Sequence, residues 1–269
     1  VAGYLIFSPE DFSRLGKHLI AGASFTSNLL LNREAGYFDS ASELKPFLHL
    51  WSLGVEEQFY VLWPVILMLS FFARWNLLYV TGTLLIASFA LNVGTIKENH
   101  SNVFYLLPGR LWELLLGCGV AINRFRRPTK RASSKPIIEV FISLISIGAL
   151  FIGATFFNKH SIFPGWRALV PTVASMLFIL SGPHAWFNRA ILSHPLLVGI
   201  GLISYPLYLW HWPILSIARI IQENHQLESG LATGLLFLSA ALAFMTRRWV
   251  ELPTQAFFKF KSEKGIRRN

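Results

Sequence analysis

The sequence is 269 residues long, with 53% hydrophobic and only 14% charged residues, and its mean hydropathy is +0.48. A soluble domain carries about a quarter charged residues to cover its surface, so this composition excludes that class. The net charge of +10 at pH 7 would also suit nucleic-acid binding, but the basic residues cluster beside apolar blocks, which is typical of membrane orientation instead.

The chain starts at Val1 rather than Met, and no signal peptide precedes its first polar residues, so we expect it to be part of a longer protein. The stretch SPED at residues 8–11 predicts a helix start, because Ser is a good N-cap and Pro suits the first helical position. A helix over about 11–31 carries Arg14 and His18 on an otherwise small and apolar stretch. We predict that this helix lies at the membrane interface or re-enters the membrane.

Seven apolar segments follow, each about 17 to 22 residues long, which is the length needed to cross roughly 30 Å of hydrocarbon. They cover about 55–73, 77–94, 104–123, 137–156, 166–182, 200–221 and 229–248. The predicted fold class is therefore all-α: a polytopic transmembrane helix bundle of about seven spans plus the N-terminal helix. The single cysteine, Cys118, lies inside one apolar segment and can form no intrachain disulfide.

The segment 123–136 holds six Lys or Arg residues and no acid, which predicts a cytoplasmic location. Successive spans cross the membrane in alternating directions. With the segment 123–136 in the cytoplasm, the basic tail, 259–269, is expected on the same side and the loop at 32–54 on the external side. We expect one transmembrane domain over 1–258, incomplete at its N-terminus, followed by the cytoplasmic tail.

The stretch PFLHLWSLGVEEQFYVLWPVIL, residues 46–67, places two adjacent carboxylates, Glu56 and Glu57, against an apolar run. A carboxylate at the edge of a hydrocarbon layer costs a few kcal/mol or more, so such groups usually have a partner or a function. The functional interpretation is a carboxylate site at the external mouth of a cavity. The alternative is that both acids lie in the headgroup layer and pair with loop lysines such as Lys45.

A second polar cluster lies in LLPGRLWELLLG, residues 106–117, where Arg110 and Glu113 stand three apart on one helix face. In one interpretation the two neutralise each other within a structural helix. In the other, Arg110 pairs with Glu56 or Glu57 from a different helix, because an Arg that precedes its acid is the weaker helical orientation.

The third cluster is ISYPLYLWHWPIL, residues 203–215, in which Tyr208 and His211 share a helix face. A neutral imidazole near the middle of a span can act as a base, a ligand or a hydrogen-bond partner. The alternative is a structural histidine in the core. No spacing in the chain is typical of a zinc site, a phosphate-binding glycine loop or a nucleophile elbow, and we expect no metal.

Taken together, five stretches resemble the bacterial acyltransferase-3 family. They are HLWSLGVEEQFYVLWP (49–64), FYLLPGRLWELLLG (104–117), FPGW (163–166), ISYPLYLWHWP (203–213) and RWVELP (248–253). They occur in the order found in the family, and the similarity extends over nearly the whole chain.

The resemblance implies an integral membrane O-acyltransferase of the bacterial inner membrane. Such enzymes pass an acyl group, usually acetyl, from cytoplasmic acyl-CoA to a hydroxyl of an extracytoplasmic glycan or cell-envelope polysaccharide. Acyl-CoA is then a co-substrate, no cofactor is permanently bound, and the partners are the lipid bilayer and the glycan acceptor. Peptidoglycan, lipopolysaccharide O-antigen, exopolysaccharide and secreted glycosides all remain open as acceptors.

Attack of a sugar hydroxyl on a thioester needs a base and donors for the developing oxyanion, and aromatic rings suit sugar faces. The family's proposed catalytic His lies in a first span that this chain does not contain, so the residues below are expected in supporting roles. The residues expected to support catalysis are Glu56, Glu57, Arg110, Glu113 and His211. The residues expected to bind substrate are His49, Trp51, Tyr60, Trp63 and Tyr208.

Two alternatives come from other classes. A transporter or flippase could use the same intramembrane acids and histidine as a relay, although such proteins often show repeated halves and no repeat is visible here. A truncated, inactive membrane protein is the other. An upstream span with Arg and His about ten residues apart would favour the acyltransferase.

Overall fold

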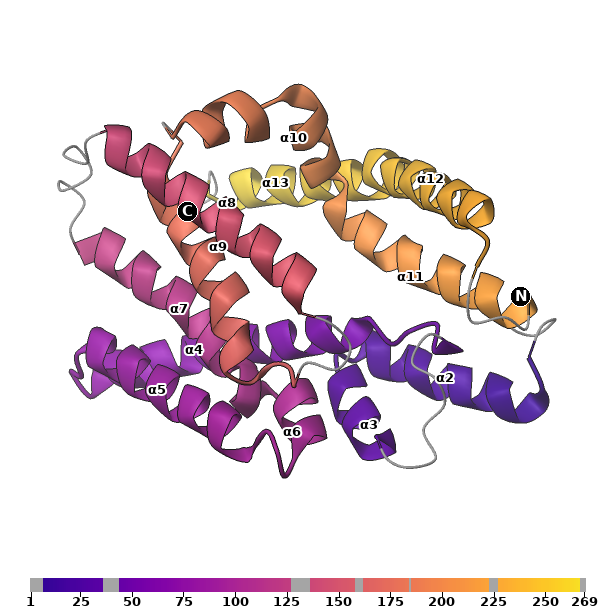
Figure 1. The fold of residues 1–269 in the computed structure, drawn as a ribbon, viewed down its shortest axis with the longest axis horizontal. Helices are drawn as coiled ribbons and strands as arrows, with labels where there is room; N and C mark the ends of the chain where they lie inside the picture. Colours follow the sequence, from indigo (N-terminus) through magenta and orange to yellow (C-terminus); the bar gives the residue numbers. More distant parts are fainter. Residues whose placement is uncertain are drawn as a thin grey trace. The chain divides into compact units, whose positions relative to one another are not determined.

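The computed structural model describes residues 7–35, 44–126, 136–157, 162–183, 185–222 and 227–266, and its regular elements there are all helices (Figure 1). The chain divides into two compact units. Unit 1 consists of Val1–Ile20, Phe38–Leu50 and Pro195–Asn269, and unit 2 consists of Ala21–Tyr37 and Trp51–His194. Residues 127–135, which carry most of the predicted cytoplasmic anchor, and the end of the tail from 267 lie outside the described residues.

Unit 2 is built from pairs of packed helices. Its elements are α3 (Ser27–Glu34), α4 (Leu50–Phe72), α5 (Leu77–Thr95), α6 (His100–Tyr105), α7 (Leu107–Arg126), α8 (Pro136–Phe156), a 3-10 turn η3 (Gly165–Ala168), α9 (Leu169–Ser181) and a π-helical turn η4 (Asn188–Leu192). Helix α5 packs along α7 and α8 packs along α9, while the short α6 contacts both α3 and α7 (Figure 1).

Unit 1 contains most of α2 together with the C-terminal helices. Its elements are α2 (Pro9–Ala23), α10 (Pro195–Leu202), α11 (Ser204–Ile221), α12 (Ser229–Thr246), a π-helical turn η5 (Arg247–Glu251) and α13 (Leu252–Ile266). Helix α11 packs along α12, and the Trp210 indole donates to the Thr246 hydroxyl at 3.0 Å between them. Arg247 donates to the carbonyl of Leu202 at 2.6 Å, which ties the end of α10 to the end of α12.

The predicted start of the first helix is confirmed. The Ser8 hydroxyl accepts from the Asp11 backbone amide at 3.2 Å, as an N-cap does, and Pro9 is the first helical residue. The expected continuous helix over 11–31 is wrong, because α2 ends at Ala23 and α3 begins at Ser27. Between them Phe25 adopts a left-handed conformation (φ 56°), which no helix interior tolerates.

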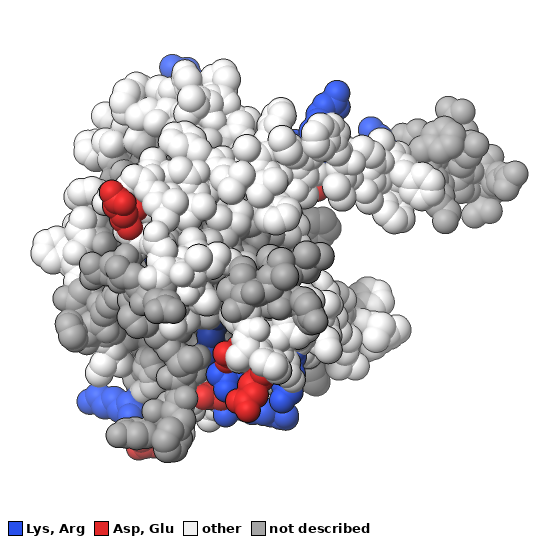
Figure 2. Space-filling model, turned by 90° about the vertical axis from the view of Figure 1, so that its right-hand side faces the viewer, with Lys and Arg blue, Asp and Glu red and all other residues white. Residues whose placement is uncertain are grey.

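Among the described residues, five helical stretches are long and apolar enough to cross a membrane. They are Leu50–Phe72, Leu77–Thr95, His100–Arg126, Ile137–Phe156 and Ser229–Lys259, and a shorter apolar helix spans Gly165–Ser181. Uncharged side chains cover most of the described surface in the view of Figure 2, and charged ones gather in a few places. The all-helical, multi-pass membrane fold is therefore confirmed. The segment expected at 200–221 is helical but broken at Ile203, between α10 and α11.

Polar side chains join α5 to the first turn of α7. The Ser88 hydroxyl donates to the Pro108 carbonyl at 2.6 Å and accepts from the Trp112 amide at 3.0 Å. The Asn92 amide donates to the Gly109 carbonyl at 2.8 Å. Ser88 and Asn92 are one helical turn apart on α5, and both side chains are buried. Their hydrogen bonds therefore fix the position of the first turn of α7, which carries Arg110, relative to α5.

Gly109 allows α6 to pack closely against the start of α7. An added Cβ would lie 2.6 Å from the Val103 carbonyl oxygen and 2.9 Å from its Cα, and both are backbone atoms that cannot turn away. We expect Gly109→Ala to lower the free energy of unfolding by about 1–3 kcal/mol, measured by thermal unfolding in detergent. The matched control is Gly117→Ala in the same helix, where a Cβ meets nothing within 4 Å. Equal midpoints for the two variants would contradict the steric argument.

Candidate functional site

Unit 1 holds a pair of neighbouring imidazole rings. His49 lies in the turn before α4, and its ring centroid is 5.8 Å from that of His211 on α11. The Tyr208 ring lies 4.8 Å from the His49 ring, at 63°, and contacts its edge. Three residues predicted from two separate stretches, His49, Tyr208 and His211, are therefore brought together.

Two hydrogen bonds hold the turn before α4 against α11. The Tyr208 hydroxyl donates to the backbone carbonyl of His49, and the Trp212 indole donates to the carbonyl of Lys45 at 2.9 Å. Both acceptors are main-chain atoms, so the turn is positioned whatever side chains it carries. Pro213 is compatible with this packing although it removes one helical amide, because α11 continues through it.

The hydrogen bond of His211 defines its tautomer. Its Nδ1 lies 3.0 Å from the carbonyl oxygen of Leu207, and a carbonyl can only accept. In the neutral ring Nδ1 therefore carries the proton, and Nε2 has a free lone pair. This arrangement is the one that prepares an imidazole to accept a proton or a hydrogen bond at Nε2.

The His49 side chain is buried, at 8% exposure, and neither ring nitrogen has a hydrogen-bond partner among the described residues. Burial, and secondarily the neighbouring His211, lowers the pKa of His49 from 6.5 to about 4. Its ring is thus neutral at physiological pH, with one donor and one acceptor available. Buried polar atoms are nearly always bonded, so such a pair of unbonded nitrogens indicates a place for a ligand or a water molecule.

The low pKa of His49 makes stability depend on pH. Between pH 6.5 and about pH 4 the unfolded chain binds the proton and the folded chain does not, so stability is complete above pH 6.5 and falls below it. We expect the loss from pH 7 to pH 4.5 to be about 2 kcal/mol larger for the wild type than for His49→Gln. Unfolding of both proteins in detergent across this range measures the difference, and parallel curves would contradict it.

Unit 2 holds the second cluster, around the guanidinium of Arg110. Its Nε lies 3.1 Å from Glu113 Oε1, and Glu113 supplies the only carboxylate within 4.0 Å of Arg110 among the described residues. The Arg110 guanidinium carbon also lies 5.3 Å from the Trp51 ring centroid, 5.8 Å from that of Phe104 and 5.9 Å from that of Phe163. Of the two interpretations left open, the structure shows the pair within α7.

Three aromatic rings therefore surround a cation that also has an ion-pair partner. Trp51 and Phe104 contact each other at 4.7 Å between centroids, which keeps this aromatic wall closed. Arg110 Nη1 is buried and has no hydrogen-bond partner among the described residues. The cluster can therefore donate from Nη1 to an anionic oxygen while Glu113 limits its net charge.

The structure does not bring the remaining predicted residues into either cluster. Glu56 is exposed and Glu57 half-exposed on α4, and neither makes a hydrogen bond or ion pair among the described residues. Tyr60 is 58% exposed, and the ring of Trp63 stacks on Phe59 at 5.6 Å, so these two aromatics pack along the helix surface. Site roles for these four residues stay predictions.

Asn28 is a buried polar residue that the sequence patterns did not single out. Asn28 on α3 exchanges two hydrogen bonds with Gln58, at 3.2 and 2.9 Å, and also donates to the Tyr105 carbonyl at 3.1 Å. This amide pair ties α3 to α4 beside the two carboxylates, which explains why the stretch carries Gln58. An Asn that directly precedes three leucines, in the segment 27–34, was the signal available.

The fold and these clusters define a multi-pass membrane protein in which a buried histidine lies beside a second, partly exposed one and an arginine lies among aromatic rings. The chain belongs to the acyltransferase-3 family, whose sequence model, described as "Acyltransferase domain", matches residues 11–248.

Among characterised relatives, the chain is 28% identical over 277 residues to the O-acetyltransferase OatA of Staphylococcus aureus strain NCTC 8325, covering 97% of this chain and 45% of that protein. The same identity over 260 residues relates it to OatA of strain MRSA252, covering 93% and 43%. The chain thus spans less than half the length of these relatives. No solved structure matches it.

Proposed function

We propose that the protein containing this chain is a membrane O-acetyltransferase that moves an acetyl group from acyl-CoA to a hydroxyl of an extracytoplasmic glycan. Family membership and relatives named as O-acetyltransferases support this assignment. The observation that carries the site is the buried, neutral His49 beside His211, with both His49 ring nitrogens unbonded among the described residues. Acyl transfer needs hydrogen-bonding groups that hold and orient the acceptor hydroxyl.

In this reaction the acceptor oxygen attacks the thioester carbonyl carbon, a C–O bond forms, and the C–S bond breaks. The hydroxyl proton passes to a base, and the departing CoA sulfur takes up a proton. A ring with a pKa of about 4 is a weak base at neutral pH, so His49 is assigned to hold and orient the acceptor hydroxyl by hydrogen bonding. His211 Nε2, with its lone pair available, accepts a hydrogen bond in the same cluster.

Arg110 is assigned to the stabilisation of negative charge. A negatively charged group of the acyl donor is stabilised best by a hydrogen-bond donor that is already oriented. The aromatic wall and Glu113 hold the guanidinium in place, and Nη1 points its hydrogen atoms at no described acceptor. Its charge is therefore positioned before any substrate arrives.

The experiment compares envelope glycans by mass spectrometry from cells with and without the intact gene. The expected result is loss of O-acetyl groups from one glycan in the deletion strain and their return with the wild-type gene. An unchanged acetyl pattern, together with a solute that accumulates, would overturn the assignment in favour of transport. Intact cells test the whole protein, of which this chain is the described part.

A further inference from the structure

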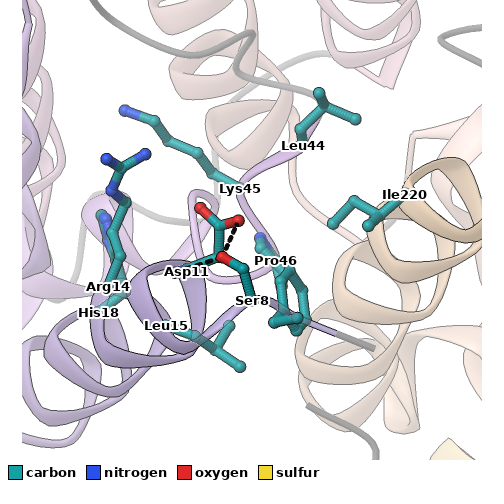
Figure 3. A pocket seen from close by; sticks show the side chains of 10 residues that line it. Ser8, Asp11, Arg14, Leu15, His18, Leu44, Lys45, Pro46 and Ile220 are labelled. Carbon is teal, nitrogen blue, oxygen red and sulfur yellow. Dashed lines mark hydrogen bonds between the residues drawn. The ribbon is translucent and has the colours of Figure 1, made fainter. Parts of the chain in front are cut away.

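The cavities of the two units differ in size and in the charge of their linings. Unit 1 contains a cavity of about 240 Å³ between α2 and the segment that precedes α4 (Figure 3). Arg14 and Asp11 bring opposite charges to it, and the buried His18 and Lys45 each interact with a further neighbour. The charges of this lining therefore indicate no preference for a charged ligand. A larger groove, of about 540 Å³, lies in unit 2.

The groove of unit 2 lies between the end of α4 and the start of α5. Residues 73–76 join these two helices, but α5 packs along α7 rather than along α4, which leaves space between α4 and α5. The volume of the groove is within the range of small-molecule sites. Apolar side chains form most of its walls, and they come from Ile66, Leu69, Val80 and Leu84.

The walls of this groove belong to segments that can span a membrane. Both helices have the length and the hydropathy of a span. The lining extends to Ile66 on α4 and to Leu84 on α5, which is about 10 Å from the turn along each helix. One leaflet of the hydrocarbon layer is about 15 Å thick, so the part of a ligand that lies at this depth must be apolar.

The end of the groove at the turn is polar. Trp75, Asn76 and Tyr79 line it there, and Trp75 and Tyr79 are 64% and 77% exposed. Tryptophan and tyrosine favour the level of the lipid headgroups, because their rings have an apolar body and a polar group. The groove therefore extends from residues typical of the headgroup level to an apolar interior, as a phospholipid does.

Arg74, which directly precedes Trp75, supplies a positive charge at this polar end. Its side chain is exposed and makes no hydrogen bond or ion pair with the residues that the structure describes. The sequence contains no Asp or Glu between Glu57 and Glu98, so no acid of the turn offsets this charge. A positive charge at the headgroup level favours a ligand with an anionic headgroup.

The backbone of the turn does not explain an arginine at this position. Arg74 has a left-handed conformation (φ 55°), and its amide donates to the Phe71 carbonyl at 3.1 Å. The Trp75 amide donates to the Ser70 carbonyl at 2.9 Å. These two bonds define a Schellman motif, in which glycine is the usual residue at the left-handed position. An arginine is strained there, which indicates that its side chain serves another purpose.

We propose that this groove binds one phospholipid of the surrounding bilayer, with an anionic headgroup beside Arg74 and an acyl chain between α4 and α5. Trp75 and Tyr79 contact the glycerol region, and Leu69 and Leu84 contact the chain. The apolar walls distinguish such a ligand from a soluble anion, which has no chain to fill them. The groove shares no residue with the two clusters described above.

The test uses the purified full-length protein in neutral detergent, with an equimolar mixture of phosphatidylglycerol and phosphatidylcholine that have the same acyl chains. Native mass spectrometry is expected to show one phosphatidylglycerol per chain, retained about fivefold over phosphatidylcholine. In Arg74→Gly the two lipids should be retained equally, while the thermal unfolding midpoint is unchanged or higher, because glycine suits the left-handed turn. Lys97→Gly makes the same loss of charge at the other end of α5 and, as the control, should keep the preference.

The acyl chain has its own matched pair of variants. Thr83→Phe fills part of the groove and should remove most of the bound lipid, whereas Val93→Phe, at an exposed residue of similar size on α5 outside the groove, should not. Equal retention of the two lipids by the wild type, or equal effects of Arg74→Gly and Lys97→Gly, would overturn the proposal. Lipid that survives Thr83→Phe lies elsewhere, and a dimer without lipid would show that a second copy covers the groove; either result also contradicts it.

Discussion

Replacing His49 by Gln in the full-length protein is expected to lower acetyl transfer by about 30- to 100-fold. Glutamine keeps a donor and an acceptor but not their positions in an imidazole ring, so the acceptor hydroxyl loses its orienting hydrogen bond. A lost buried hydrogen bond of this kind raises the barrier by about 2–3 kcal/mol. Because the ring makes no side-chain hydrogen bond to described residues, its replacement should leave the turn and its backbone bonds to α11 intact.

The measurement is the rate of acetyl transfer from acetyl-CoA to the acceptor, in membranes that contain equal amounts of each protein. His194→Gln is the control, because it makes the same substitution at an exposed histidine outside both clusters. A separate determination of kcat and KM distinguishes orientation from binding, since loss of an interaction made in the transition state lowers kcat. Full activity of His49→Gln would show that His49 has no role in acetyl transfer.

The elements themselves could largely be predicted from the sequence, because apolar run length and the SPED cap are local signals. The breaks between them were harder to predict. Helix α6 ends at Tyr105 and α7 begins at Leu107, and Ile203 separates α10 from α11, where hydrophobicity alone shows one continuous segment. In both places a proline follows within three residues, a signal that indicates a helix start as well as a kink.

Only part of the two clusters could be predicted from the sequence, because one depends on a local contact and the other on a long-range contact. The pairing of Arg110 with Glu113 was one of two open interpretations, because three-residue spacing on a helix is local information. The contact of His49 with Tyr208 spans 159 residues, and no periodicity encodes a distance of that kind. The same holds for the burial of Lys45, which depends on how α2 and α11 pack around it and which the sequence suggested only as a loop lysine.

Arg110→Met is expected to lower the free energy of unfolding more than Gly109→Ala does. Methionine has a similar length and fills the aromatic wall, but it leaves the Glu113 carboxylate mostly buried without its cation. Removing one partner of a buried pair costs about 3–5 kcal/mol, and the partial exposure of this pair favours the lower figure. Loss of the cation–π contacts with Trp51 adds to it.

The double variant Arg110→Met/Glu113→Gln separates these contributions. It removes both charges, so the uncompensated carboxylate disappears and more than half of the lost stability should return. Thermal unfolding of the four proteins in one detergent completes the cycle. If the double variant is as unstable as Arg110→Met alone, the instability comes from the aromatic packing around the guanidinium, and the ion pair with Glu113 is not what holds Arg110 in place.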